Sequence, residues 1–212
     1  MPIPKFAAGV IRFQREVFPE KRALFETLHG GQEPEALFIT CSDSRIETAM
    51  ITQTGPGELF ICRNAGNIVP PHSTATGGMT ASIEYALAVL NVPHLVICGH
   101  TECGAMKAAL SGEGTSALRH VREWLYFAEA AVDTARELWA DADEATRLAM
   151  LTEQNVILQL RHVATHPSVA RRLARGDLEL HGWVYDIKTG AVQAYNEERR
   201  VFEPVATHYA AR

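Results

Sequence analysis

The chain has 212 residues, of which 47% are hydrophobic and 21% charged, a composition typical of a folded globular protein rather than a disordered one. A chain of this length buries enough apolar surface to fold without disulfides or a structural metal. Its formal net charge of −5 argues against nucleic-acid binding, which needs a basic surface.

The sequence lacks the features of a membrane or exported protein. No stretch approaches the roughly 20 apolar residues that span a bilayer. The apolar run before Arg12 and Arg15 is too short to be the core of a signal peptide. We therefore expect a cytoplasmic protein that does not contact a membrane. In a reducing compartment, its four cysteines are core residues, metal ligands or catalytic thiols.

The first half of the chain alternates helical and strand patterns. Segment 5–29 repeats apolar residues at helical spacing. Three short apolar runs follow, at 36–40, 58–62 and 94–98, and a helix is expected over 79–90. Runs that are apolar on both faces are typical of parallel strands covered by helices. The order strand, helix, strand indicates a parallel sheet.

The second half is mainly helical over 116–175 and then alternates polar and apolar residues over 178–196, which predicts a terminal hairpin. The sequence therefore predicts an α/β fold: a central, mostly parallel sheet flanked by helices, with an N-terminal helical arm and a C-terminal hairpin at the sheet edge. The sequence contains no repeat or linker, so we expect a single domain over 1–212, with the arm at 1–30 and the core at 31–196.

Two chemically distinctive segments follow the first and third strands. The first strand is followed by Cys41-Ser42-Asp43-Ser44-Arg45, and the third is followed by His100-Thr101-Glu102-Cys103-Gly104. The carboxyl ends of parallel strands meet at one edge of a sheet, where ligands bind. Two thiolates and an imidazole are preferred zinc ligands, and three protein ligands leave a fourth position open. The alternative is that each is simply a buried side chain.

The other two cysteines, Cys62 and Cys98, lie inside the apolar runs, where buried structural thiols are expected. Cys98 lies two residues before His100 and is therefore an alternative ligand on the same face.

These two motifs, CSDSR and HTECG, resemble the zinc signature of the β-class carbonic anhydrases. The resemblance extends over residues 37–106, including RNAGN at 63–67, and continues at 153–169 and 178–190. It covers at least residues 30–195.

The resemblance implies that Cys41, His100 and Cys103 hold one zinc ion per chain, and that Asp43 and Arg45 act as a catalytic pair. In some members the aspartate becomes a fourth zinc ligand when the site is closed. In the open state it turns to the arginine and accepts a hydrogen bond from the zinc-bound water.

Other residues match the family's substrate pocket. The resemblance implies that Gln32 and the backbone N–H of Gly104 bind bicarbonate and that Phe60 and Tyr85 line the pocket, part of it across a dimer interface. Phe38 stands where a bacterial subclass tends to carry tryptophan. Together with Gln32, this favours the plant- and cyanobacterial-like subclass.

The implied function is the zinc-dependent, reversible hydration of CO2 to bicarbonate and a proton, by attack of zinc-bound hydroxide on CO2 while Asp43 and Arg45 orient the water. Zinc lowers the pKa of its bound water toward neutrality. We expect a homodimer, or a tetramer or octamer built from dimers, with segment 5–29 lying across the partner.

Three alternatives remain open. Carbonyl sulfide and carbon disulfide hydrolases resemble this family and keep its zinc ligands. A non-catalytic zinc module would need a fourth ligand, which Asp43 can supply. A thiol redox protein would need a close CxxC pair, and the nearest spacing here is Cys98 to Cys103.

Overall fold

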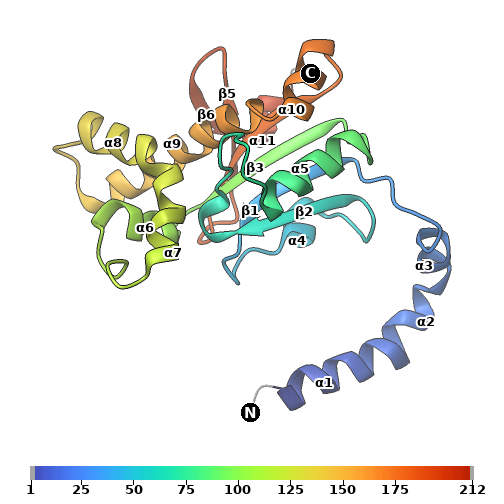
Figure 1. Cartoon of the computed structure of the whole chain (residues 1–212). Helices are drawn as coiled ribbons and strands as arrows, with labels where there is room; N and C mark the ends of the chain where they lie inside the picture. Colours follow the sequence, from blue (N-terminus) through green and yellow to red (C-terminus); the bar gives the residue numbers. More distant parts are fainter. Residues whose placement is uncertain (1–2, 211–212) are drawn as a thin grey trace. The chain divides into compact units, whose positions relative to one another are not determined.

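The computed structural model describes residues 3–210 and contains a six-stranded sheet in the order β2-β1-β3-β4-β5-β6 (Figure 1). The first four strands in this order are parallel, and the last two are antiparallel to their neighbours. The predicted α/β class, the mostly parallel sheet and the C-terminal hairpin are therefore confirmed. The strands are β1 Ala36–Cys41, β2 Leu59–Asn64, β3 His94–His100, β4 Glu179–Tyr185, β5 Val192–Asn196 and β6 Val201–Pro204.

Burial separates the central strands from the edge strand. Every residue of β1 is buried, as is β3 beyond His94, as expected for strands that are covered on both faces. β2 lies at the edge of the sheet and is only partly buried, with Ile61 43% exposed. The prediction of a run buried on both faces is correct for β1 and β3, and wrong for β2.

The helices connect and cover these strands. The helix predicted over 79–90 is present as α5, which runs between β2 and β3. The long helix α9 begins at its N-cap Asp143, whose carboxylate accepts a hydrogen bond from the Thr146 N–H at 2.7 Å. The α-helices are α4 Thr48–Thr52, α5 Gly78–Ala88, α6 Gly104–Ser111, α7 Arg119–Leu125, α8 Glu129–Leu138, α9 Glu144–Ala164, α10 Pro167–Arg175 and α11 Val205–Tyr209. No helix in the described part of the chain is long and apolar enough to span a membrane.

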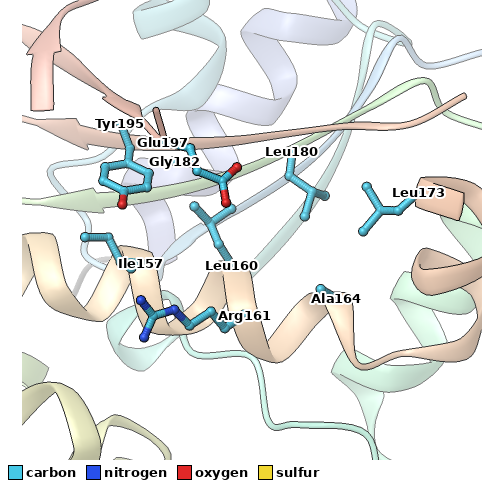
Figure 2. A pocket seen from close by; sticks show the side chains of 9 residues that line it. All are labelled: Ile157, Leu160, Arg161, Ala164, Leu173, Leu180, Gly182, Tyr195 and Glu197. Atoms are coloured by element: carbon cyan, nitrogen blue, oxygen red, sulfur yellow. The ribbon is translucent and has the colours of Figure 1, made fainter. Parts of the chain in front are cut away.

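Two glycines let α9 lie close to the sheet. A Cβ atom on Gly99 of β3 would lie 2.9 Å from Val156, and one on Gly182 of β4 would lie 2.8 Å from Leu160 and 2.9 Å from Val156. A cavity of about 370 Å³ opens beside Gly182, between α9, α10 and the strands (Figure 2). None of the predicted site residues lines it.

The chain divides into two compact units, Met1–Glu33 and Pro34–Arg212. The N-terminal unit contains α1 Ile3–Arg12, a π-helical turn Phe13–Val17, α2 Phe18–Glu20 and α3 Arg22–Leu28. Its Phe18 and Phe25 rings stack with their centroids 5.4 Å apart. The helical arm is confirmed. The expected single domain, with its limits at 30 and 196, stays a prediction.

Candidate metal centre

The carboxyl ends of β1 and β3 lie side by side, because the two strands are neighbours in the sheet. β1 ends at Cys41 and β3 at His100, and α6 begins at Gly104, directly after Cys103. The turn between β3 and α6 is tight, with Glu102 in the left-handed region at φ 57°. This topology brings together two motifs that are about 60 residues apart in sequence.

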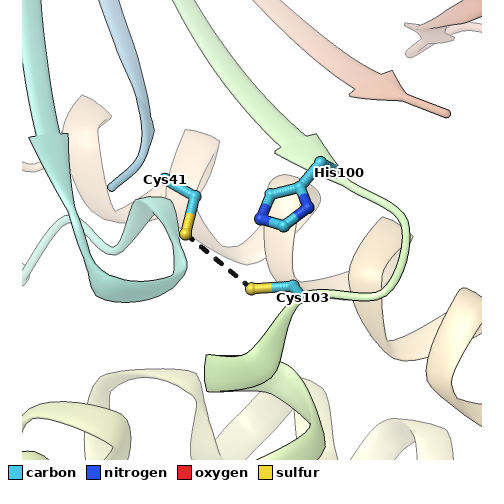
Figure 3. Close-up of side chains that lie close together, drawn as sticks. All are labelled: Cys41, His100 and Cys103. Atoms are coloured by element: carbon cyan, nitrogen blue, oxygen red, sulfur yellow. Dashed lines mark hydrogen bonds between the residues drawn. The ribbon is translucent and has the colours of Figure 1, made fainter. Parts of the chain in front are cut away.

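Three donor atoms converge at this edge of the sheet. The Sγ atoms of Cys41 and Cys103 and a ring nitrogen of His100 all lie within 4.8 Å of one another (Figure 3). The two sulfurs are 3.9 Å apart, far beyond the roughly 2.05 Å of a disulfide. Two sulfurs that bind one tetrahedral zinc ion at about 2.3 Å each lie about 3.8 Å apart. The spacing therefore fits a shared metal ion.

The orientation of His100 also fits a metal ligand. Its Nδ1 lies 2.9 Å from the Thr101 carbonyl oxygen, which fixes the N–H on Nδ1. Its Nε2 is fully buried and has no hydrogen-bond partner among the described residues. Metal-binding histidines commonly donate their second nitrogen to a backbone carbonyl in this way. A cation at the two sulfurs would satisfy the Nε2 lone pair.

The two thiols differ in how readily they lose a proton. The hydrogen bond with Cys103 lowers the pKa of Cys41 to about 4, whereas the same bond and burial raise the pKa of Cys103. The Gly66 N–H donates to Cys41 Sγ at 3.4 Å. The pair therefore loses its first proton easily and holds the second, which a metal ion would displace.

Asp43 is held at the edge of the cluster by Arg45. The Arg45 Nε and Nη2 donate to the two carboxylate oxygens at 2.9 and 2.7 Å, and the Arg45 backbone N–H donates to Oδ1 at 2.9 Å. These bonds hold the pKa of Asp43 well below its usual range. Asp43 Oδ2 is 3.9 Å from His100 Nε2. The carboxylate thus lies beside the donor cluster while it is bound to the arginine.

Arg63 is a site residue that sequence reasoning missed. Its Nε donates to the Cys41 carbonyl at 3.0 Å, and its Nη2 donates to the Asp43 and Ile46 carbonyls at 2.8 Å each. One guanidinium therefore holds the backbone of the loop that carries Cys41 and Asp43. The only signal in the sequence is its place at the start of RNAGN.

The other predicted site residues lie in several elements. Gly104 is the first residue of α6, where backbone N–H groups lack helical partners. Phe60 of β2 and Tyr85 of α5 pack together with ring centroids 5.9 Å apart. Gln32 is exposed and belongs to the N-terminal unit. The structure brings together the three donors, Asp43, Arg45 and the start of α6.

The remaining cysteines do not join the cluster. Cys62 packs in the main core with Leu37 and Ile83. Cys98 packs against Phe38 and Val96, and burial raises its pKa to about 12. Cys98 is therefore a core thiol and not a ligand in this arrangement.

Two thiols and an imidazole at the carboxyl edge of a parallel sheet define a candidate metalloprotein of the α/β class. A family model described as carbonic anhydrase matches residues 36–192. The carbonic anhydrase of Pseudomonas aeruginosa is 49% identical over 206 residues, which cover 96% of this chain and 92% of the relative. The carbonic anhydrase of Synechococcus elongatus is 42% identical over 89% of this chain and 70% of the relative.

A solved structure, that of the β-carbonic anhydrase CcaA, superposes with a TM-score of 0.92 at 39% identity, over 95% of this chain and 91% of that one. The chain belongs to the β-class carbonic anhydrases. It is accordingly an enzyme of the lyase class that hydrates CO2.

Proposed function

We propose that this chain is a zinc enzyme that interconverts CO2 and bicarbonate, with Cys41, His100 and Cys103 as the zinc ligands. The observation that carries this proposal is the buried Nε2 of His100, which has no hydrogen-bond partner in the part of the chain that the structure describes. It faces two thiols whose sulfurs are spaced as around a tetrahedral ion. Three protein ligands leave one coordination position for the reaction. When bound, zinc supplies hydroxide near neutral pH by lowering the pKa of a water ligand.

Asp43 and Arg45 act on the attacking water. The Asp43 carboxylate lies beside the donor cluster and accepts the water's hydrogen bond, which directs the lone pair toward CO2. The two parallel bonds from the Arg45 guanidinium hold the carboxylate in place and keep it off the metal. In a closed state, Asp43 would leave Arg45 and become the fourth ligand.

The substrate pocket would combine polar and apolar contacts. The Gly104 N–H, at the start of α6, would donate to a substrate oxygen, and Gly104 is exposed. Phe60 and Tyr85 would line the pocket, and Gln32 is assigned to bicarbonate binding as in the plant- and cyanobacterial-like subclass. The family resemblance supports these assignments.

We also propose that the active form is a homodimer or a dimer-based tetramer or octamer. The β-carbonic anhydrases of Sordaria macrospora, which resemble this chain at a TM-score of 0.72, 33% identity and 90% coverage of this chain, are described as tetrameric. The N-terminal unit exposes large apolar side chains, including Phe6 and Val10. Exposed patches of this kind mark interaction sites.

Stopped-flow CO2 hydration, with zinc measured on the same sample, tests the proposal. We expect one zinc per chain and activity that rises over about pH 6 to 9, because two thiolates offset both charges of the ion and make it a weaker acidifier of water. Cys41→Ala should lose both metal and activity. Zinc without activity at about pH 8–9 would indicate a non-catalytic module. Faster turnover of carbonyl sulfide or carbon disulfide would indicate a hydrolase.

The role of Arg45 gives a separate prediction. Arg45→Ala should keep its zinc and lose at least about tenfold in kcat, which corresponds to about 1.4 kcal/mol, because Asp43 is no longer held toward the water. The matched control is Arg171→Ala, which removes an exposed arginine from α10. Full activity of the Arg45 variant, or loss of its zinc, would contradict the orienting role.

A further inference from the structure

A second group of side chains that could bind a metal ion lies at the amino-terminal ends of β3 and β4, opposite the carboxyl ends where Cys41 and His100 lie. His94 is the first residue of β3, and Glu179 is the first residue of β4. His94 pairs with Glu179 in the parallel register, and His181 follows Glu179 by two residues. Because side chains two apart share one face of a strand, all three project from the same face of the sheet.

The donor atoms of these residues converge. All three residues offer a ligand atom within 4.8 Å of the others. His181 Nε2 lies 3.2 Å from His94 Nδ1 and 3.8 Å from Glu179 Oε2. Ligand atoms around a tetrahedral ion with bonds of about 2.0–2.1 Å lie about 3.3–3.4 Å apart. The two separations fall on either side of that value.

The second nitrogen of His181 is already oriented. Its Nδ1 lies 2.9 Å from the Tyr209 hydroxyl, and the Trp183 indole N–H donates to the same hydroxyl at 3.0 Å. These contacts hold the ring in place, and the hydroxyl can accept a hydrogen bond from Nδ1–H, the tautomer in which the Nε2 lone pair can bind a metal. The side chain of His181 is only 9% exposed, whereas that of Glu179 is 57% exposed. The cluster is therefore anchored on the sheet and open to solvent at the carboxylate.

We propose that His94, Glu179 and His181 form a second metal site, which takes a divalent borderline ion such as Zn2+ through two imidazoles and one carboxylate. Two nitrogens and one oxygen suit Zn2+ and Co2+ better than Mg2+ or Ca2+, which prefer oxygen ligands. Ligation replaces the hydrogen bond between the two imidazoles.

This site is separate from the cluster of Cys41, His100 and Cys103. His94 and His100 are at opposite ends of β3, six residues apart, which is about 20 Å along a strand. An apolar cavity of about 400 Å³, lined in part by Phe38, Trp183 and Tyr209, lies beside the histidine pair. A metal here would join the starts of β3 and β4, outside the proposed reaction.

Metal titration of the tag-free, zinc-loaded chain tests the proposal at about pH 8, where imidazole is neutral. We expect a second equivalent of Zn2+ by calorimetry. Added Co2+ should give d–d absorption bands without a thiolate-to-cobalt charge-transfer band, because no sulfur lies in this cluster. A charge-transfer band would place the Co2+ at the cysteines and overturn the assignment.

Variants separate the two sites. Glu179→Gln changes an exposed ligand and should weaken the second equivalent at least about tenfold, since loss of an outer contact to a ligand already costs about 10–100-fold. His181→Gln should abolish it, while the first zinc remains. Cys41→Ala should keep only the second site. The matched control is His120→Gln on α7, which removes an exposed histidine elsewhere and should retain both.

The competing account is a histidine–histidine hydrogen bond alone. It predicts one equivalent of metal in the wild-type chain and no change on Glu179→Gln, and either result overturns the proposal. Circular dichroism on each variant shows whether the chain has folded. If His181→Gln fails to fold, the exposed Glu179→Gln variant decides the question. Because the readout is the stoichiometry of added metal, the outcome is independent of CO2 hydration.

Discussion

A single guanidinium fixes the backbone around the proposed zinc ligand. Arg63 donates to three carbonyls between Cys41 and Ile46, and this segment also carries the side chain of Asp43. Its planar set of donors can hold several acceptors at fixed angles, which an ammonium group cannot do. Arg63 is therefore a positioning residue, which acts on the reaction through Cys41 and Asp43.

Replacing Arg63 should disturb the geometry of the reaction more than metal binding. We expect Arg63→Gln to lower kcat by about tenfold with little change in zinc content, and to cost about 1–2 kcal/mol of unfolding free energy through the lost hydrogen bonds. Arg63→Lys should recover only part of kcat. The control is Arg119→Gln, which breaks only an exposed pair with Glu123 in α7. Equal loss of zinc and kcat in the Arg63 variants would show a merely structural role.

At the residue scale, the sequence identifies donor atoms but not their orientation. Cys41 and His100 are recognisable because they follow apolar runs whose ends must meet at one edge of a parallel sheet. The turn of Asp43 toward Arg45 depends on side-chain torsions. The bonds of Arg63 end on backbone carbonyls, and every residue has a carbonyl, so they leave no pattern in the sequence.

Among the helices and strands, prediction and structure agree best where the hydrophobic pattern of the segment is strong. β1, β3 and α5 combine strong hydrophobic patterns with burial, and all three could be predicted. The strand β2 could be predicted from its apolar run at 58–62, but its partial exposure as an edge strand could not. The short elements β6 and α11 could not be predicted, because their residues match neither the helical nor the strand pattern. The pairing of β6 with β5 is decided by tertiary contact, not by local preference.

The packing of α9 on the sheet depends on glycines in the strands beneath it. A Cβ at Gly182 would lie 2.8 and 2.9 Å from Leu160 and Val156. Val156 is fully buried and cannot move freely. We expect Gly182→Ala to lower the unfolding free energy by about 1–3 kcal/mol, the usual cost of overpacking, measured by denaturant titration. Gly78→Ala, where a Cβ meets no atom within 4 Å, should be nearly neutral. Equal effects of the two changes would contradict the close approach of α9.

The partly buried His162 and the buried His166 connect α9 and the start of α10 to the loop before α5. His162 Nδ1 lies 2.9 Å from the Val69 carbonyl, and His166 Nε2 lies 3.0 Å from the Pro70 carbonyl. Burial lowers the pKa of both below the ordinary value, so the folded state keeps them neutral. The unfolded chain therefore binds more protons once the pH falls below about 6.5.

The consequence is a stability that falls with acidification. The contribution of these histidines is complete above the unfolded pKa, and it declines as the pH drops through the lowered, folded values. We expect the midpoint temperature of thermal unfolding to decrease as the pH is lowered from about 7 to 5. This temperature should depend less steeply on pH in His166→Gln, whose amide still provides a donor for the Pro70 carbonyl. His120→Gln, which alters an exposed residue of α7, should retain the wild-type slope. An unchanged slope in His166→Gln would refute this origin of the pH dependence.

At the scale of the whole molecule, the two units differ in how they are held together. Residues 34–212 contain the three buried hydrophobic clusters. The N-terminal unit has no buried residue in its π-helical turn, α2 or α3. Phe6, Val10 and Phe13 of this unit are 62%, 56% and 41% exposed. Burial of apolar surface contributes about 25 cal/mol per Å². Burying these side chains against a partner subunit would therefore stabilise an assembly substantially.

Charges placed on this apolar stripe should therefore break up the oligomer. Phe6 and Val10 are four residues apart and share one face of α1. We expect the double variant Phe6→Glu, Val10→Glu to shift the mass measured by multi-angle light scattering from a dimer or larger assembly to a monomer, with zinc retained because residues 34–212 carry its ligands. Arg12→Glu lowers the net charge by the same two units without removing an apolar side chain, and it should leave the mass unchanged. An intact assembly in the double variant would show that the arm does not hold the subunits together, and dissociation of the Arg12 variant would point to charge rather than apolar contact.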